Sequence, residues 1–106
     1  MSEVIVVAKS RAIPGKEAEL EAALRACVTP THKEAGCLTY ALHRGADDPT
    51  AFALIERWTS REALDAHLRL PHVAALFTAL PMLVAEPPEI LVLNALGAGD
   101  PEKSRL

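Results

Sequence analysis

The chain has 106 residues, half of them hydrophobic, which is enough for one domain with a real core. Its 11 basic and 14 acidic residues give a net charge of −3 without a run of either sign. This pattern excludes the clustered basic surface that nucleic acid or an anionic membrane would need. No stretch approaches the roughly 18 apolar residues of a membrane span.

The N-terminal sequence MSEVIVVAKS does not have the basic start and long apolar run of a signal peptide. The two cysteines, Cys27 and Cys37, have neither a metal-binding spacing nor a disulfide framework. We expect them to be free thiols in a reducing compartment. These features together predict a cytoplasmic protein.

The first half of the chain predicts two strands separated by a helix. A β-branched run over residues 3–13, closed by a Pro-Gly pair, predicts the first strand. Apolar residues then recur with helical period over residues 16–31, and Pro30 should kink or end this helix. The stretch CLTYALHR (37–44) predicts the second strand.

The stretch AFALIERWT (51–59) predicts a third strand, and the polar, turn-rich connection before it predicts a hairpin. Thr59 and Glu62 have the spacing of a capping box, which predicts a helix running to about Leu70.

A further helical pattern begins at Pro71 and is interrupted at Pro81, and residues 89–96 (EILVLNAL) predict a fourth strand. We therefore expect one domain over residues 1–97 and a C-terminal tail over residues 98–106. The order strand, helix, strand, strand, helices, strand is typical of an α+β, ferredoxin-like split βαβ fold with an antiparallel sheet.

The first and fourth predicted strands are apolar on both faces, although helices can cover only one face of such a sheet. In the first strand Ile5 and Val7 oppose Val4 and Val6, and the fourth strand has the same character. A bare apolar face marks an interface. The pattern therefore predicts a homodimer in which the sheets of two chains face each other.

Alternation along the third strand places Glu56 and Trp58 on one face, together with Phe52. In the following helix His67 shares its apolar side with Leu64. If this helix folds back on the strand, a carboxylate, an imidazole and an indole could meet. A buried carboxylate needs a partner, and such a pocket could support proton transfer.

Less specific interpretations of the same residues remain open. A histidine on an apolar helix side is often a structural residue, and Glu56 could instead pair with Arg44 across the hairpin. His72, in the first turn of its helix, is expected to be exposed. Tyr40 and His43 lie on opposite faces of their strand, and Tyr40 is the better pocket candidate because a phenol can donate a hydrogen bond from an apolar wall.

No metal site is predicted, because the histidines show no H-x-x-x-H or H-x-x-E-H spacing. The sequence also has no dinucleotide-binding fingerprint, no P-loop and no nucleophile elbow. The sequence motifs therefore indicate no cofactor.

A series of motifs carries a family resemblance: GCLTY (36–40), ERW (56–58), AHL (66–68), PHV (71–73) and PEIL (88–91). Their order resembles the antibiotic biosynthesis monooxygenase superfamily and is most similar to its small quinol monooxygenase-like members. The resemblance covers roughly residues 3 to 97. It implies a dimeric α+β barrel, with a cavity between helices and sheet in each subunit.

The resemblance also implies an activity: oxidation of a quinol or polyphenol by molecular oxygen, without metal, flavin or haem. On that basis His67 or Glu56 would remove a phenolic proton, Trp58 would wall the ring or hydrogen-bond to it, and Tyr40 and Phe52 would help to bind it. Relatives on the same fold suggest two alternatives, an isomerase of a small metabolite and a non-catalytic small-molecule-binding or stress protein.

Overall fold

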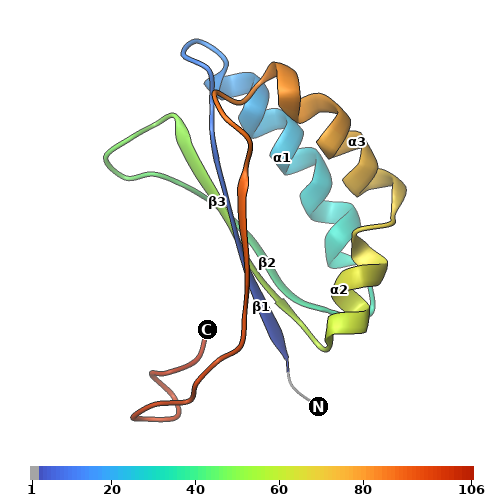
Figure 1. Cartoon of the computed structure of the whole chain (residues 1–106), viewed down its shortest axis with the longest axis vertical. Helices are drawn as coiled ribbons and strands as arrows, with labels where there is room; N and C mark the ends of the chain where they lie inside the picture. Colours follow the sequence, from blue (N-terminus) through green and yellow to red (C-terminus); the bar gives the residue numbers. More distant parts are fainter. Residues whose placement is uncertain (1–2) are drawn as a thin grey trace.

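The computed structural model describes residues 3–106, so the first two residues of the predicted domain lie outside the described part of the chain. Helices pack on one face of a four-stranded antiparallel sheet (Figure 1). The elements in chain order are β1 (Val4–Arg11), α1 (Glu17–His32), β2 (Cys37–Arg44), β3 (Ala51–Trp58), α2 (Arg61–His67), α3 (Pro71–Ala79), a short 3-10 helix (Leu80–Met82) and β4 (Glu89–Leu93).

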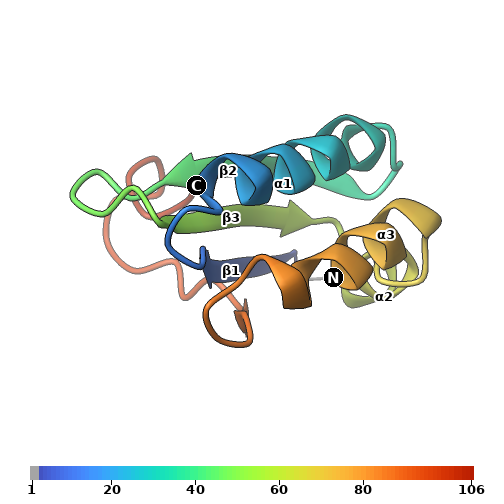
Figure 2. The ribbon, with the colours of Figure 1, turned by 90° about the horizontal axis from the view of Figure 1, so that it is seen from above.

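The strands are ordered β2-β3-β1-β4 and every neighbouring pair is antiparallel. This is the ferredoxin-like arrangement that the order of elements predicted. Helices α1 and α3 pack side by side in a single layer over the sheet (Figure 2). The fold class is therefore confirmed.

The core lies between these two layers. Register pairs Val6 with Glu56 and Glu56 with Tyr40, so these residues of three neighbouring strands share the helix-covered face. All three are buried, as are Leu24 of α1 and Leu64 of α2. The covered face thus holds polar side chains within an apolar core.

Several predicted boundaries shift by a few residues. The N-cap of α2 is Ser60, whose Oγ accepts the N–H of Ala63 at 3.1 Å, and the predicted cap at Thr59 is wrong. Thr59 is still engaged outside the helix, because its N–H donates to the carbonyl of Gly36 at 2.9 Å. Helix α2 ends at His67, three residues before the predicted Leu70.

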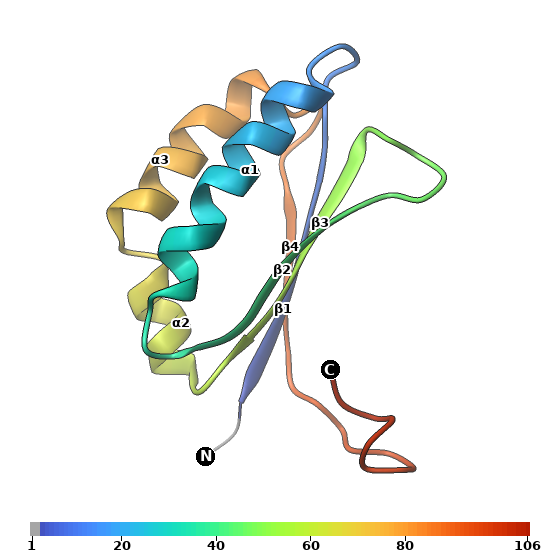
Figure 3. The same cartoon turned by 180° about the vertical axis from the view of Figure 1, so that it is seen from behind.

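The elements near the C-terminus are also shorter than the pattern predicted. Helix α3 ends at Ala79 and gives way to the 3-10 turn at Pro81, and β4 ends at Leu93 where residue 96 was predicted. Residues 94–106 form no helix or strand and leave the sheet at its lower end (Figure 3). No helix formed by residues 3–106 has both the length and the apolar character needed to span a bilayer.

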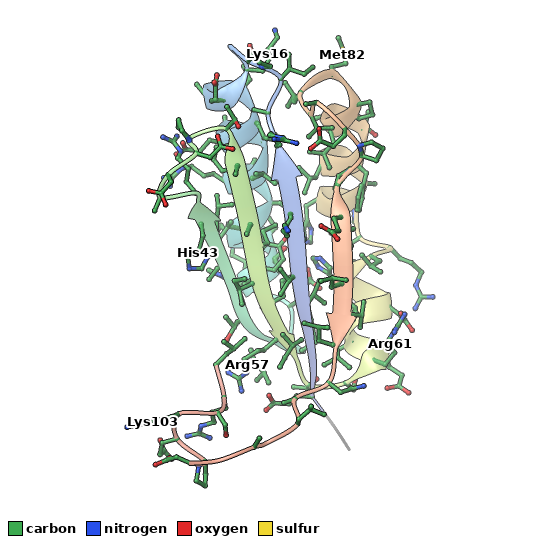
Figure 4. All side chains as sticks on the ribbon, turned by 60° about the vertical axis from the view of Figure 1, so that its left-hand side comes forward. Lys16, His43, Arg57, Arg61, Met82 and Lys103 are labelled. Carbon is green, nitrogen blue, oxygen red and sulfur yellow. The ribbon has the colours of Figure 1, made fainter. Side chains whose placement is uncertain are left out.

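The other face of the sheet carries no helix, and Figure 4 shows it from the side opposite the helices. Cross-strand pairs place Val7, Ile55 and Ala41 in one row across it, with Leu91 of β4 beside Val7. Leu91 is 44% exposed. We call this surface the open face.

Candidate functional site

A cavity of about 120 Å³ lies between the covered face of the sheet and helices α2 and α3. Its buried polar lining comes from three residues, Tyr40, Glu56 and His67. The apolar walls come from all layers of the fold and include Val6, Leu24, Leu54, Leu64, Leu76 and Ile90. A dry cavity of about 150 Å³ holds one benzene ring, so this space suits a small ring system.

His67 is the last residue of α2 and is 3% exposed. Its Nδ1 lies 2.8 Å from Oε2 of Glu34. Because a carboxylate only accepts hydrogen bonds, Nδ1 carries the hydrogen and Nε2 keeps a free lone pair. Glu34 does not line the cavity and His67 does, so Nδ1 is engaged outside the cavity and Nε2 is the ring nitrogen left for a molecule bound in it.

Burial lowers the pKa of His67 below its ordinary value, and the hydrogen bond that His67 donates to Glu34 opposes this effect without cancelling it. The imidazole is therefore held neutral and in one orientation. A neutral, oriented imidazole with an available lone pair is the form that accepts a proton.

His72 donates to the same carboxylate oxygen: its Nε2 lies 2.8 Å from Oε2 of Glu34. Its side chain is only 19% exposed, so the prediction of an exposed His72 is wrong. In one continuous helix, residues five apart would lie about 140° apart around the axis. The extended Leu70 and the following Pro71 break the helix between the two histidines, and this break lets both rings reach Glu34.

Glu34 itself lies in the loop between α1 and β2, where the chain passes close to α2. A Cβ at Gly36 would lie 2.4 Å from Cβ of Ala63, so only glycine permits this approach. The carbonyl of Gly36 also accepts the N–H of Thr59 at 2.9 Å. These contacts hold the loop against α2 and carry Glu34 to His67.

Glu56 is 5% exposed and accepts a hydrogen bond from Nε1 of Trp58, with an N···O distance of 2.9 Å. Burial raises the pKa of Glu56 to about 7, although the Trp58 hydrogen bond lowers it and the charge of Glu34 raises it further. The prediction that Glu56 is buried and paired is confirmed. The alternative pairing with Arg44 is wrong, because Arg44 pairs with Glu21.

Trp58 is fully buried, and its ring centroid lies 4.5 Å from that of His67. It does not line the cavity. The prediction that Trp58 and His67 line one pocket is therefore correct for His67 alone, since Trp58 packs behind it. The indole N–H is occupied by Glu56 and fixes the position of that carboxyl group.

Tyr40 lines the cavity as predicted, with its ring edge-on to His67 at a centroid distance of 5.6 Å. Its hydroxyl donates to Sγ of Cys27 at 3.7 Å. Burial raises the pKa of Tyr40 well above its ordinary value, so the phenol stays neutral. Tyr40 therefore shapes the cavity with its ring, and its hydrogen is directed to the sulfur.

Phe52 shares the strand face of Glu56 but does not line this cavity. Four residues of strand separate the two by about 13 Å, at about 3.3 Å per residue. Phe52 lies instead under the guanidinium of Arg44, which is 5.4 Å from its ring centroid. Its predicted role in the same pocket is therefore wrong.

Sequence reasoning missed the cluster of Glu34, His67 and His72, whose potential metal-ligating atoms all lie within 4.8 Å of one another. The motifs H-x-x-x-H and H-x-x-E-H place two histidines on one helix, whereas these two histidines lie on either side of a helix break. The proline directly before His72 is the signal that could have indicated the break.

Comparison with known proteins adds the family. Residues 3–79 match the model of a family described as antibiotic biosynthesis monooxygenase. The chain belongs to this family. Membership supports a monooxygenase-like function in general terms, and it confirms the resemblance carried by the motifs.

Relatives with solved structures have the same fold. PA3566 of Pseudomonas aeruginosa is 33% identical with a TM-score of 0.85, over 91% of this chain and 96% of that one. Rv0793 of Mycobacterium tuberculosis is 37% identical over 95 residues, which are 90% of this chain and 93% of that protein. Its solved structure superposes with a TM-score of 0.83.

A third relative is longer than this chain. The uncharacterized protein sll1783 of Synechocystis is 28% identical over 89 residues, 84% of this chain. The match spans 60% of that relative's own length. The likeness therefore concerns one part of the longer protein.

Proposed function

We propose that this protein is a monooxygenase that oxidises a small phenol or quinol with molecular oxygen, the substrate itself supplying the electrons. One observation carries the proposal: Nδ1 of the cavity-lining His67 lies 2.8 Å from a carboxylate oxygen of Glu34, a contact that favours the tautomer with Nε2 as the proton acceptor. Glu56, with a pKa raised to about 7, lines the same cavity and can donate a hydrogen bond when protonated.

The reaction begins when His67 removes the phenolic proton. The phenolate passes one electron to O₂, and the resulting phenoxyl radical and superoxide combine to form a carbon–oxygen bond on the ring. The peroxide takes up a proton. Loss of the ring hydrogen to a base then breaks the O–O bond, giving the quinone and hydroxide, which a proton converts to water. One oxygen atom thus enters the product and the other leaves as water.

The surrounding residues have supporting roles in this scheme. A protonated Glu56 would bind the substrate oxygen and return a proton to the peroxide, and Trp58 holds its carboxyl group in place. The ring of Tyr40 and the apolar walls would exclude water from the charged intermediates. The cavity volume of about 120 Å³ favours a single-ring substrate.

We also propose that the active form is a homodimer joined through the open face. The support is the row of apolar residues across the sheet, with Leu91 and Leu93 at 44% and 39% exposure. Two such faces in contact would remove this surface from water, at about 25 cal/mol per Å² of apolar area. The arrangement would also close both sheets into the barrel that the resemblance implies.

Oxygen uptake tests the activity. The purified protein is incubated with single-ring phenols and hydroquinones in an oxygen electrode, with heat-denatured protein as the autoxidation control. We expect uptake above the control and incorporation of labelled oxygen from ¹⁸O₂ into the product. Conversion under anaerobic conditions would indicate an isomerase instead. Ligand-dependent stabilisation without any turnover would indicate a binding protein.

A further inference from the structure

We propose that Glu34, His67 and His72 form a binding site for a divalent transition-metal ion, with Zn²⁺ as the best-suited ion. The observation is convergence: Nδ1 of His67 and Nε2 of His72 each lie 2.8 Å from the same carboxylate oxygen. All the candidate ligand atoms lie within 4.8 Å of one another. The ligands come from the α1–β2 loop, the end of α2 and the start of α3, so the fold itself assembles the set.

The donor chemistry selects the class of ion. Two imidazole nitrogens and one carboxylate oxygen suit Zn²⁺, Co²⁺, Ni²⁺ and Fe²⁺. Mg²⁺ and Ca²⁺ prefer an all-oxygen environment, which this cluster does not offer. With three protein ligands, a fourth position would remain for water.

Charge also favours a cation here. The side chains of Glu34 and His67 are 13% and 4% exposed, so the carboxylate is largely removed from water. Among residues 3–106, the ion pairs of Glu34 are with His67 and His72, and none involves a lysine or arginine. Without such a cation beside it, the negative charge of this carboxylate is poorly compensated, and a bound divalent ion would offset it. The partial exposure of His72 gives the ion a route from solvent.

The site needs only a small expansion to accept an ion. Ligand atoms at about 2.1 Å from a tetrahedral ion lie about 3.4 Å apart, so Glu34 would withdraw from each nitrogen by about 0.6 Å. Each histidine would move its hydrogen to its other ring nitrogen. The ion would sit outside the cavity, because neither Glu34 nor His72 lines it.

Metal binding would therefore reach the cavity through the ring of His67. With the ion on Nδ1, Nε2 would carry the hydrogen and become a donor in place of an acceptor. On the proposed function, this change would switch off the base. The existence of the site does not depend on that function, because metal binding and the position of the hydrogen can be measured without any turnover.

The first measurement is a titration of the chelator-treated full-length protein with Co²⁺, whose visible absorption reports ligation by nitrogen. We expect one Co²⁺ per chain, displaced by Zn²⁺. His72→Ala should weaken Co²⁺ binding by about 100-fold or more, because it removes a ligand. His43→Ala, which removes an exposed histidine on the open face, is the matched control and should bind like the wild type. Equal binding by both variants would overturn the proposal.

The second measurement uses the unmodified protein, so it does not depend on the folding of a variant. Proton–nitrogen correlation spectra of the imidazole rings are recorded with and without Zn²⁺. We expect the shifts of Nδ1 of His67 and Nε2 of His72 to change together, and Nε2 of His67 to become protonated. Changes confined to His32 and His43, or no change at stoichiometric Zn²⁺, would show that the cluster is only a hydrogen-bonded support.

Discussion

The two faces of the sheet differ in polarity, and at some positions the difference is the opposite of what is usual for a sheet with one face covered. On neighbouring positions of β2 and β3, the covered face holds Tyr40 and Glu56, whereas the open face holds Ala41 and Ile55. A soluble sheet usually buries its apolar face and exposes its polar face. Here a few polar groups lie inside the apolar core, and a row of apolar groups lies on the uncovered face. The buried polar groups of the covered face are explained by the proposed functional site. The exposed apolar groups of the open face are explained by a proposed partner that covers them.

The inner polar groups are all accommodated: within residues 3–106, no buried side-chain nitrogen or oxygen is left without a hydrogen-bond partner. A buried polar group without a hydrogen-bond partner lowers the stability of the fold, whereas a paired one favours a single arrangement of the core. The pairing of Glu56 with Trp58 and of His67 with Glu34 therefore stabilises the fold and orders the site together.

The largest expected effect comes from placing a charge on each face of β3 in turn. Leu54, which is 4% exposed, lies in the core. Leu54→Asp should lower the free energy of unfolding by about 3–5 kcal/mol or more and leave much of the protein unfolded. Ile55→Asp, on the open face, should keep the native circular dichroism spectrum but abolish the dimer in light scattering. An unchanged dimer in Ile55→Asp would remove the proposed role of the open face.

The next effect concerns activity alone and compares histidines on the two faces. His67→Ala should lower turnover about 100-fold or more, the usual scale for loss of a general base. His43→Ala changes an exposed residue of β2 and should have wild-type turnover. Steady-state oxygen uptake per folded molecule, with folding checked by thermal denaturation, makes the comparison. Equal turnover in the two variants would leave His67 with a packing role only.

A smaller effect is expected in the pH dependence of stability. The groups that face Glu56 are Tyr40 from β2, Trp58 on its own strand, His67 from α2 and, through its charge, Glu34. Because the folded state raises the pKa of Glu56 from an ordinary 4.5 to about 7, it binds this proton more tightly than the unfolded state. The contribution of this proton to the free energy of unfolding is complete below pH 4.5 and is lost as the pH rises through 7.

Glu56→Gln keeps an acceptor for Trp58 and removes the titration. Relative to this variant, the wild type should lose about 2–3 kcal/mol of stability between pH 4.5 and pH 8. Urea denaturation across this range measures the difference, and Glu62→Gln, at an exposed position of α2, serves as the control. Parallel pH profiles for wild type and Glu56→Gln would contradict a raised pKa.

The smallest effect is expected where the loop of Glu34 passes α2. In Gly36→Ala the new Cβ would meet that of Ala63, and separation of loop and helix should cost about 1–3 kcal/mol. The double variant with Ala63→Gly removes the clash, so the two changes should be clearly non-additive. Additive losses in thermal or urea denaturation would show that the approach is not as close as described.

The covered face could be predicted from the sequence to a large extent, because alternation along β3 decides which residues share a side. This alternation (parity) alone placed Glu56 and Trp58 on the same face of β3 and predicted the burial of Glu56. Parity carries no information on distance along the strand, so it also included Phe52. The approach of Glu34 to the two histidines depends on a loop, a helix end and a helix break, which no periodic pattern encodes.

The buried polar groups and much of the apolar wall of the cavity come from different segments of the chain, and this has a consequence for how such proteins diverge in sequence. The buried or half-buried, hydrogen-bonded polar groups of the site, from Glu34 to His72, lie in one continuous middle segment of the chain. Much of the apolar wall comes from the two ends, with Val6 and Ala8 on β1 and Ile90 and Val92 on β4. Mutations in the terminal strands can therefore reshape the space offered to a substrate while the chemistry is inherited unchanged.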